Sequence, residues 1–138
     1  MPREEAPHAA GLVLIDTSVW IAALDPAGDD GCRRQVSALL TSRRAATCEI
    51  VVAEVLRGAE DDREAQLLEE RLRSLVRLSM DGVGAVAAAM GRKMGTPRQR
   101  LADLLVAAVA FAHDVALLHR DRHLAQIAER FRIPQTPA

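Results

Sequence analysis

The run Leu12-Val13-Leu14-Ile15 limits most strongly what this chain can fold into. It is short, continuously apolar and rich in β-branched residues, which is typical of a strand buried on both faces of a parallel sheet. The run ends abruptly at Asp16, and the segment Asp16-Thr17-Ser18 supplies the side chains that cap a helix beginning near Val19. The chain is therefore expected to start with a buried strand that leads directly into a helix.

Short strands and helices alternate along the rest of the chain. Further strands are predicted at 45–47, where the pattern is weak, and at 75–78 and 115–118. Apolar periodicity and capping residues predict seven helices. The first follows Asp16, the second starts at Asp29, the third spans 49–59, the fourth starts at Asp61, the fifth runs from Asp81 to Gly95 and Pro97, and the last two span 101–113 and 121–130. This alternation predicts a three-layer α/β/α fold around a four- to five-stranded parallel sheet. In such sheets, ligands bind at the carboxyl ends of the strands, near the point where the strand order reverses.

The length of 138 residues suits a single domain. Residues 1–11 have no apolar core of the kind found in secretory signals, so we expect a flexible extension there and one domain over residues 12–138. The longest apolar run covers only residues 104–112, whereas a membrane-spanning helix needs about 20 residues. We therefore expect a cytoplasmic protein without a membrane span.

Charge is distributed unevenly along the chain. The net charge of −1 does not by itself indicate nucleic-acid binding. However, residues 1–91 carry −5 and residues 92–138 carry +4. The basic side chains of the last third are expected either to contact phosphate groups or to form a solvated surface.

Two aspartates follow predicted strands. Asp16 comes directly after the first strand, and Asp121 comes three residues after the strand at 115–118. Each one alone is explained as a helix cap, because Asp is favoured at that position. Together they also occupy the place where open α/β sheets bind ligands.

Two further carboxylates lie on otherwise apolar helices. Asp103 is the one polar residue between Leu101 and Ala112, a helix whose apolar character on all sides predicts burial. A buried carboxylate is costly without a partner, so a metal ion or an arginine is expected beside it. Glu54 is likewise the one charged residue in 50–56, with an exposed pair to Arg57 as the alternative.

Four such carboxylates indicate a divalent metal site. Carboxylates within about 4 to 6 Å of one another repel, so a cluster persists mainly where a cation neutralises it. Ligands that are all oxygen atoms favour Mg²⁺ or Mn²⁺. Zinc and a disulfide are not expected, because Cys32 and Cys48 lie far apart with no histidine at ligand spacing. A metal of this kind suits phosphodiester hydrolysis, since it activates water and stabilises charge on the phosphate.

Four segments of the chain resemble the acidic motifs of the PIN domain family and, within it, the VapC-type toxins of bacterial toxin–antitoxin pairs. The resemblance runs from about Leu12 to Ile133. In chain order the segments are 14–20 (LIDTSVW), 52–58 (VAEVLRG), 102–108 (ADLLVAA) and 117–122 (LLHRDR). One such segment is a weak signal, whereas four in this order are specific.

The resemblance implies an endoribonuclease that depends on Mg²⁺ or Mn²⁺, forms homodimers and is inhibited by a cognate antitoxin protein that occludes the site, often with a basic side chain. Its metal ligands would be Asp16, Glu54, Asp103 and Asp121. Thr17 or Ser18 would orient Asp16 or a metal-bound water, with simple capping as the alternative. His119 and Arg122 are candidates for contacts with the RNA substrate.

This chain departs from the family pattern at one point. Many relatives carry a further acid two residues after the fourth one, followed by an aromatic residue, where this chain has His123 and Leu124. The change puts a second metal ion in doubt, although a protonated His123 could contact phosphate. It also leaves open the alternative that the chain is a degenerate PIN domain, which binds RNA or a partner protein without cleaving it.

Other families fit the sequence less well. A phosphatase of the HAD type needs a second Asp two residues after the first, where this chain has Ser18. A receiver domain needs a lysine late in the chain, and the one lysine, Lys93, lies in the wrong region. No phosphate-binding loop or dinucleotide motif occurs. The near absence of aromatic residues favours recognition of RNA by shape and backbone, and leaves open which RNA is bound.

Overall fold

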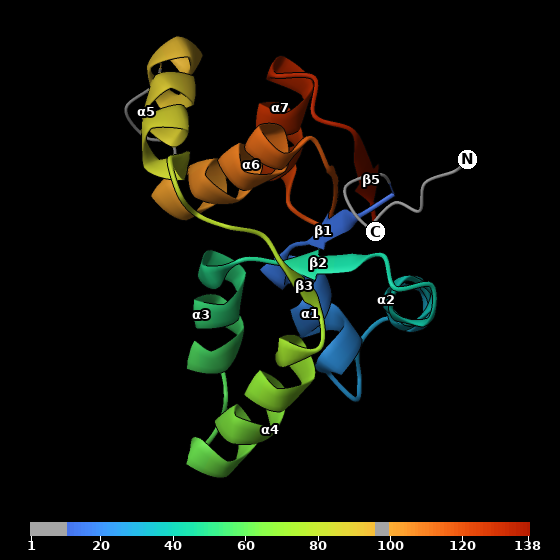
Figure 1. Ribbon diagram of the computed structural model, residues 1–138. Helices are drawn as coiled ribbons and strands as arrows, with labels where there is room; N and C mark the ends of the chain where they lie inside the picture. The colour runs from blue at the N-terminus through green and yellow to red at the C-terminus, as the bar shows by residue number, and fades with distance from the viewer. Residues whose placement is uncertain (1–10, 96–99) are drawn as a thin grey trace, which may run out of the picture.

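The strand predicted from the first apolar run lies at the centre of a five-stranded parallel sheet (Figure 1). The computed structural model describes residues 11–95 and 100–138. Its strands are β1 (Val13–Ile15), β2 (Ala45–Thr47), β3 (Val76–Arg77), β4 (Ala116–His119) and β5 (Gln135–Pro137). They lie in the order β3-β2-β1-β4-β5, and all four neighbouring pairs are parallel. Apart from Gly11, the expected N-terminal extension lies outside the described residues.

Helices cover both faces of this sheet, which confirms the predicted three-layer fold. The layer below the sheet in Figure 1 contains α1 (Thr17–Leu24), α2 (Asp30–Thr41), α3 (Glu49–Arg57) and α4 (Asp62–Arg73). The layer above contains α5 (Val83–Met94), α6 (Leu101–His113) and α7 (Arg122–Arg130). Several helices begin where the sequence predicts, because an aspartate caps the free backbone N–H groups of the first turn; Asp29 does so for α2 and Asp61 for α4.

The strand order reverses between β1 and β4. From β1 the chain proceeds outward through β2 to β3, and it then returns across the sheet to place β4 on the other side of β1. Leu14 pairs with Leu117, and the backbone N–H of Asp16 donates to the carbonyl of Leu118 over 2.9 Å. The residues that follow β1 and β4 therefore lie at the same edge of the sheet, where parallel sheets bind ligands.

The start of α5 differs from the prediction that Asp81 caps this helix. Gly82 occupies the N-cap position with a φ of 75°, and no side chain caps the helix. This left-handed backbone conformation favours glycine, which has no Cβ to clash. Asp81 uses its backbone instead, because its N–H donates to the Ser79 hydroxyl in the turn before the helix.

The prediction that α6 is buried on all sides is wrong at its two ends. Residues 106–110 are buried, but Leu101 is 66% exposed and Phe111 is 51% exposed. An apolar helix end can face solvent because much of the surface of a folded protein is apolar. Cys32 and Cys48 are free, buried thiols. No helix within residues 11–95 and 100–138 combines the length and the apolar character needed to cross a bilayer.

Candidate metal centre at the carboxyl ends of the central strands

Asp16 links the end of β1 to the first turn of α1. Its side chain is only 6% exposed. Its Oδ2 accepts the backbone N–H of Ser18 over 3.0 Å and the Ser18 hydroxyl over 2.5 Å. Both bonds fall on the same oxygen, so the described residues leave Oδ1 without a hydrogen bond.

Asp121 caps α7 in the same manner at the end of β4. Its Oδ1 accepts the backbone N–H groups of His123 over 2.7 Å and Leu124 over 3.2 Å. Among the described residues, Oδ2 again has no hydrogen bond. Capping and metal binding are therefore compatible roles for Asp16 and Asp121, because each cap occupies one carboxylate oxygen and leaves the other available.

Asp103 lies in the first turn of α6 with its side chain 15% exposed. Its Oδ2 is buried and accepts no hydrogen bond from the residues that the structure describes, and the guanidinium Nε of Arg100 lies 4.0 Å away in a long ion pair. Burial raises the pKa of the Asp103 carboxyl above its ordinary value, and the negative charges of Asp121 and Asp16 raise it further, while Arg100 and His123 act in the opposite direction. The charges of Asp103, Asp121 and Asp16 thus interact with one another at this edge of the sheet.

Glu54 reaches the same region from α3. Its side chain is half-buried, and its Oε1 accepts the Thr17 hydroxyl over 2.6 Å. Thr17 is itself only 8% exposed and follows Asp16 directly in the sequence. Glu54 thus takes its partner from α1 and not from Arg57, the alternative considered from the sequence.

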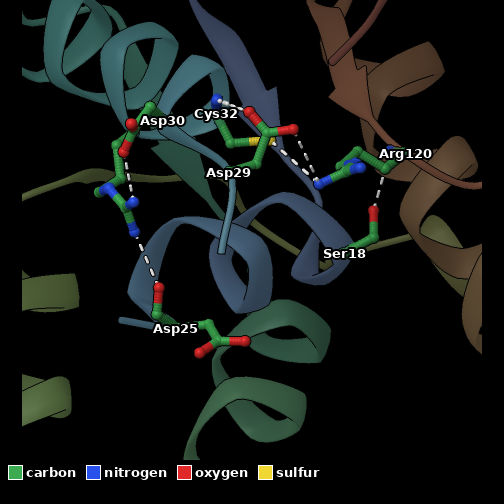
Figure 2. Close-up of polar contacts among 7 residues, drawn as sticks. Ser18, Asp25, Asp29, Asp30, Cys32 and Arg120 are labelled. Carbon is green, nitrogen blue, oxygen red and sulfur yellow. Dashed lines mark hydrogen bonds and ion pairs between the residues drawn. The ribbon is translucent and has the colours of Figure 1, made fainter. Parts of the chain in front are cut away.

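Ser18 joins the two strand ends through its hydroxyl. This oxygen accepts the backbone N–H of Arg120 over 3.0 Å (Figure 2). The same hydroxyl donates to Asp16. The guanidinium of Arg120 reaches the start of α2, where Nη1 lies 3.6 Å from Asp29 Oδ2 and 3.6 Å from Cys32 Sγ. The sequence identified Arg120 only as one basic residue among several, because nothing in its neighbours indicates that its backbone supports Ser18.

The remaining candidates lie around Asp121. His119 is only 2% exposed, and both of its ring nitrogens have partners in the protein: Nδ1 accepts the Asp121 N–H over 3.2 Å, and Nε2 lies 2.7 Å from Gln135 Oε1. Arg122 and His123 are exposed in the first turn of α7, and His123 Nδ1 lies 4.0 Å from Asp121 Oδ1. Substrate contacts by these three residues stay predictions, and the burial of His119 makes it the weakest candidate of them. No feature of the sequence pointed to Gln135.

The donor atoms at this edge of the sheet suit a hard divalent cation. They are carboxylate oxygens, and one of them, Asp103 Oδ2, is buried and accepts no hydrogen bond within the described part of the chain. Within the described residues, however, no group of three or more His, Cys, Asp or Glu side chains is close enough together to hold a metal ion as it stands. A bound ion would therefore have to draw these carboxylates closer to one another than they lie.

Comparisons with known proteins give a consistent result. The family model described as the PIN domain matches residues 13–130. Ribonuclease VapC11 of Mycobacterium tuberculosis is 33% identical over 124 residues, which cover 85% of this chain and 92% of the relative. Two solved structures have the same fold at a TM-score of 0.69: VapBC2 of Rickettsia felis bound to a fragment of promoter DNA (18% identity, 91% of this chain, 98% of the other) and DNA-bound VapBC of Salmonella typhimurium (20%, 91% and 97%).

Proposed function

The chain belongs to the PIN domain family, and on this premise we propose that it is a metal-dependent endoribonuclease acting as the toxin of a toxin–antitoxin pair. One observation carries the proposal: Asp103 has a buried carboxylate oxygen that accepts no hydrogen bond from the described residues, has only the Arg100 guanidinium at 4.0 Å to offset its charge, and lies in the field of Asp121 and Asp16. Such an arrangement disfavours the ionised state unless a cation compensates it. The name of the relative VapC11 supports cleavage of RNA, and the VapBC structures, a toxin–antitoxin family, support the partner.

In the proposed mechanism Asp16, Asp103, Asp121 and Glu54 would hold one Mg²⁺ or Mn²⁺ ion. When bound, it would supply positive charge for activation of a water molecule and for stabilisation of the attacked phosphate. Asp16 and Asp121 each offer the oxygen that capping leaves available. Ser18 fixes the orientation of Asp16, and Thr17 fixes that of Glu54. His123, in place of a further acid, favours a single metal ion.

The exposed first turn of α7 is the proposed contact for the RNA backbone. Arg122 and His123 lie beside Asp121 and are both exposed. A guanidinium group binds phosphate oxygens in a bidentate manner, and such contacts position nucleic acid without reading its sequence. This placement would bring a phosphodiester group toward the acids.

We propose that the antitoxin binds an apolar groove beside Glu54. This groove of about 730 Å³ lies between α1, α3 and α4 and includes Ile21 and Leu67, which are 61% and 54% exposed. Exposed apolar patches of this kind are typical of protein interfaces. Asp25, Glu60 and Glu64 also line the groove, which suits a partner with an apolar helix and a basic side chain.

A matched pair of variants tests this placement of the antitoxin. The small reading frame adjacent to the gene should encode a protein that suppresses growth arrest when the two are expressed together. Leu67→Glu should prevent this suppression without removing RNA cleavage. Phe111→Glu, which changes an equally exposed side chain on the opposite layer, should leave the suppression intact. Equal suppression of both variants would exclude the groove.

The proposed assembly is a homodimer. The apolar stretches near 68–75, at the end of α4, and 83–94, on α5, are poor candidates for the dimer face, because they contribute Leu72 and Met90 to the core at 3% and 4% exposure. Leu101 at the start of α6 is a better candidate, because it is 66% exposed. Light scattering of the purified protein with and without Leu101→Glu tests this assembly.

The nuclease itself is tested with purified protein and total RNA. Cleavage should occur with Mn²⁺ or Mg²⁺, stop with EDTA, and be absent from Asp16→Asn. Asp114→Asn is the matched control, because Asp114 ends α6 with a φ of 56°, a conformation that Asn also tolerates. No cleavage by the folded parent with either metal and a panel of defined RNAs would favour the degenerate PIN domain, which binds without cutting.

A further inference from the structure

His119 lies at the end of β4, two residues before Asp121, and is almost fully buried. Its exposed fraction is 2%, and its ring makes two hydrogen bonds within the protein. A buried histidine beside a reaction centre can act as a substrate contact, a metal ligand or a support for another residue. Its ring atoms distinguish these roles, because both nitrogens are already engaged.

The hydrogen bonds define the tautomer of the His119 ring. The backbone N–H of Asp121 can only donate, so Nδ1, which lies 3.2 Å from it, must be the unprotonated nitrogen. In the neutral ring the hydrogen then sits on Nε2 and is donated to Gln135 Oε1 over 2.7 Å. The amide of Gln135 has the matching orientation, because its Nε2 donates to the carbonyl of Ala125 over 3.5 Å.

These bonds hold Asp121 from both sides. His119 receives its backbone N–H, while the N–H groups of His123 and Leu124 hold carboxylate Oδ1. The remaining oxygen, Oδ2, is thereby oriented by contacts that do not use it. The last strand contributes to this arrangement through Gln135, and the N–H of Ala138 fixes the His119 carbonyl over 2.8 Å.

We propose that His119 and Gln135 are positioning residues, which together fix the backbone of Asp121 so that its free carboxylate oxygen points to the metal site. This inference rests on the proposed function and deepens it. It gives β5 a role in the centre, although this strand contributes no acid. It also replaces the hypothesis that His119 contacts the substrate.

Two variants of His119 separate positioning from bulk packing. Asn places its side-chain oxygen near the position of Nδ1 and so still accepts the Asp121 N–H, whereas Leu fills the space without an acceptor. We expect His119→Leu to bind Mn²⁺ about tenfold more weakly in calorimetry without RNA, and to cleave RNA correspondingly more slowly at limiting Mn²⁺. His119→Asn should restore most of both. His113→Leu is the control, because His113 bonds the Ser79 carbonyl at the far end of α6.

The tautomer of His119 can be measured in the unaltered protein, so this test does not depend on the folding of a variant. Long-range ¹H–¹⁵N spectra should show His119 with the hydrogen on Nε2. In a second step, Gln135→Leu should reduce the population of this tautomer and weaken Mn²⁺ binding. The hydrogen on Nδ1, or equal Mn²⁺ affinity for the parent, His119→Leu and Gln135→Leu, would overturn the positioning role. Failure of the proposed function looks different, since the folded parent itself would then neither bind Mn²⁺ nor cleave RNA.

Discussion

The hydroxyl of Thr17 donates a 2.6 Å hydrogen bond to Glu54 across 37 positions of the sequence. The bond joins the first turn of α1 to α3, and it holds a carboxylate from one helix beside the residue that follows Asp16 on another. Hydrogen bonds to an ionised group are among the stronger ones in proteins. Thr17 therefore fixes the Glu54 carboxylate beside the first turn of α1.

Thr17→Val should distinguish the contribution of this hydrogen bond from that of the side-chain shape. Valine keeps the β-branched outline but leaves Glu54 without its donor, so we expect a loss of about 1 to 2 kcal/mol in the free energy of unfolding. RNA cleavage should fall about tenfold, the size of effect that supporting residues have around metal ligands. Thr17→Ser keeps the hydroxyl and should resemble the parent. Urea denaturation and cleavage assays measure both, and equal values for Val and Ser would contradict this role.

Ser18→Ala should affect activity more than stability. The alanine variant loses the link between Asp16 and the Arg120 backbone, but it keeps the N–H that caps α1. We expect cleavage at saturating RNA to fall about tenfold, and the unfolding free energy to fall by only about 1 kcal/mol. Ser42→Ala is the control, since Ser42 bonds a helix carbonyl on an exposed part of α2. Unchanged cleavage by Ser18→Ala would reduce Ser18 to a simple cap.

Asp103→Asn should stabilise the fold while it abolishes cleavage. The amide removes a buried charge that Asp121 and Asp16 repel, and relief of such strain at functional sites commonly gains about 0.5 to 2 kcal/mol. Calorimetry without metal should show a higher Tm for the variant. A lower Tm would mean that the Asp103 carboxylate is compensated by contacts within the protein.

The gain in stability from Asp103→Asn should increase as pH rises. The pKa of Asp103 is raised in the folded protein, so the folded state binds more protons than the unfolded chain between the ordinary and the raised pKa. The parent therefore loses stability as pH rises through this window, and the variant does not. The difference in Tm should be small near about pH 4, grow as pH rises and level off above the raised pKa. A difference that shrinks with rising pH would contradict the repulsion.

Mn²⁺ should stabilise the parent by mass action. A ligand that binds only the folded state adds about 2.7 kcal/mol at a hundred times its Kd. Thermal denaturation should therefore show a Tm that rises with Mn²⁺ and returns with EDTA. Asp103→Asn and Asp121→Asn should respond much less, whereas Asp114→Asn should respond as the parent does. Equal responses from all four proteins would place the ion elsewhere.

Much of the fold follows from local sequence patterns, and its exceptions have physical causes. The predicted strand at 45–47 and helix at 101–113 agree with β2 and α6, because their apolar character and end signals are encoded nearby. Gln135-Thr136-Pro137 has no such pattern, and it forms β5 because β4 offers it a free edge. Gly82, and not the predicted Asp81, is the N-cap of α5, because the backbone there is left-handed and glycine adopts this conformation without strain.

The candidate site divides in the same way. The four acids could be proposed from the sequence, because a carboxylate after a buried strand, or on an apolar helix, contradicts its surroundings; their role as metal ligands stays a prediction. Thr17 and Ser18 could be named as supports, but their contacts could not be. The bond from Thr17 to Glu54, the bridge from Ser18 to Arg120 and the contact of His119 with Gln135 depend on where side chains point after the layers have packed. A sequence pattern carries no information about those directions.

The reversal of strand order between β1 and β4 also determines how late the central strand gains its second neighbour during synthesis. Ser18 and Arg120 meet across 102 positions, and β1 remains without one of its two neighbours until β4 leaves the ribosome. Contacts between such distant segments form late, because a long loop must close first. A growing chain therefore carries Asp16 without Asp121 beside it until β4 and the residues that follow it have been made. The proposed metal centre cannot assemble before that point of synthesis.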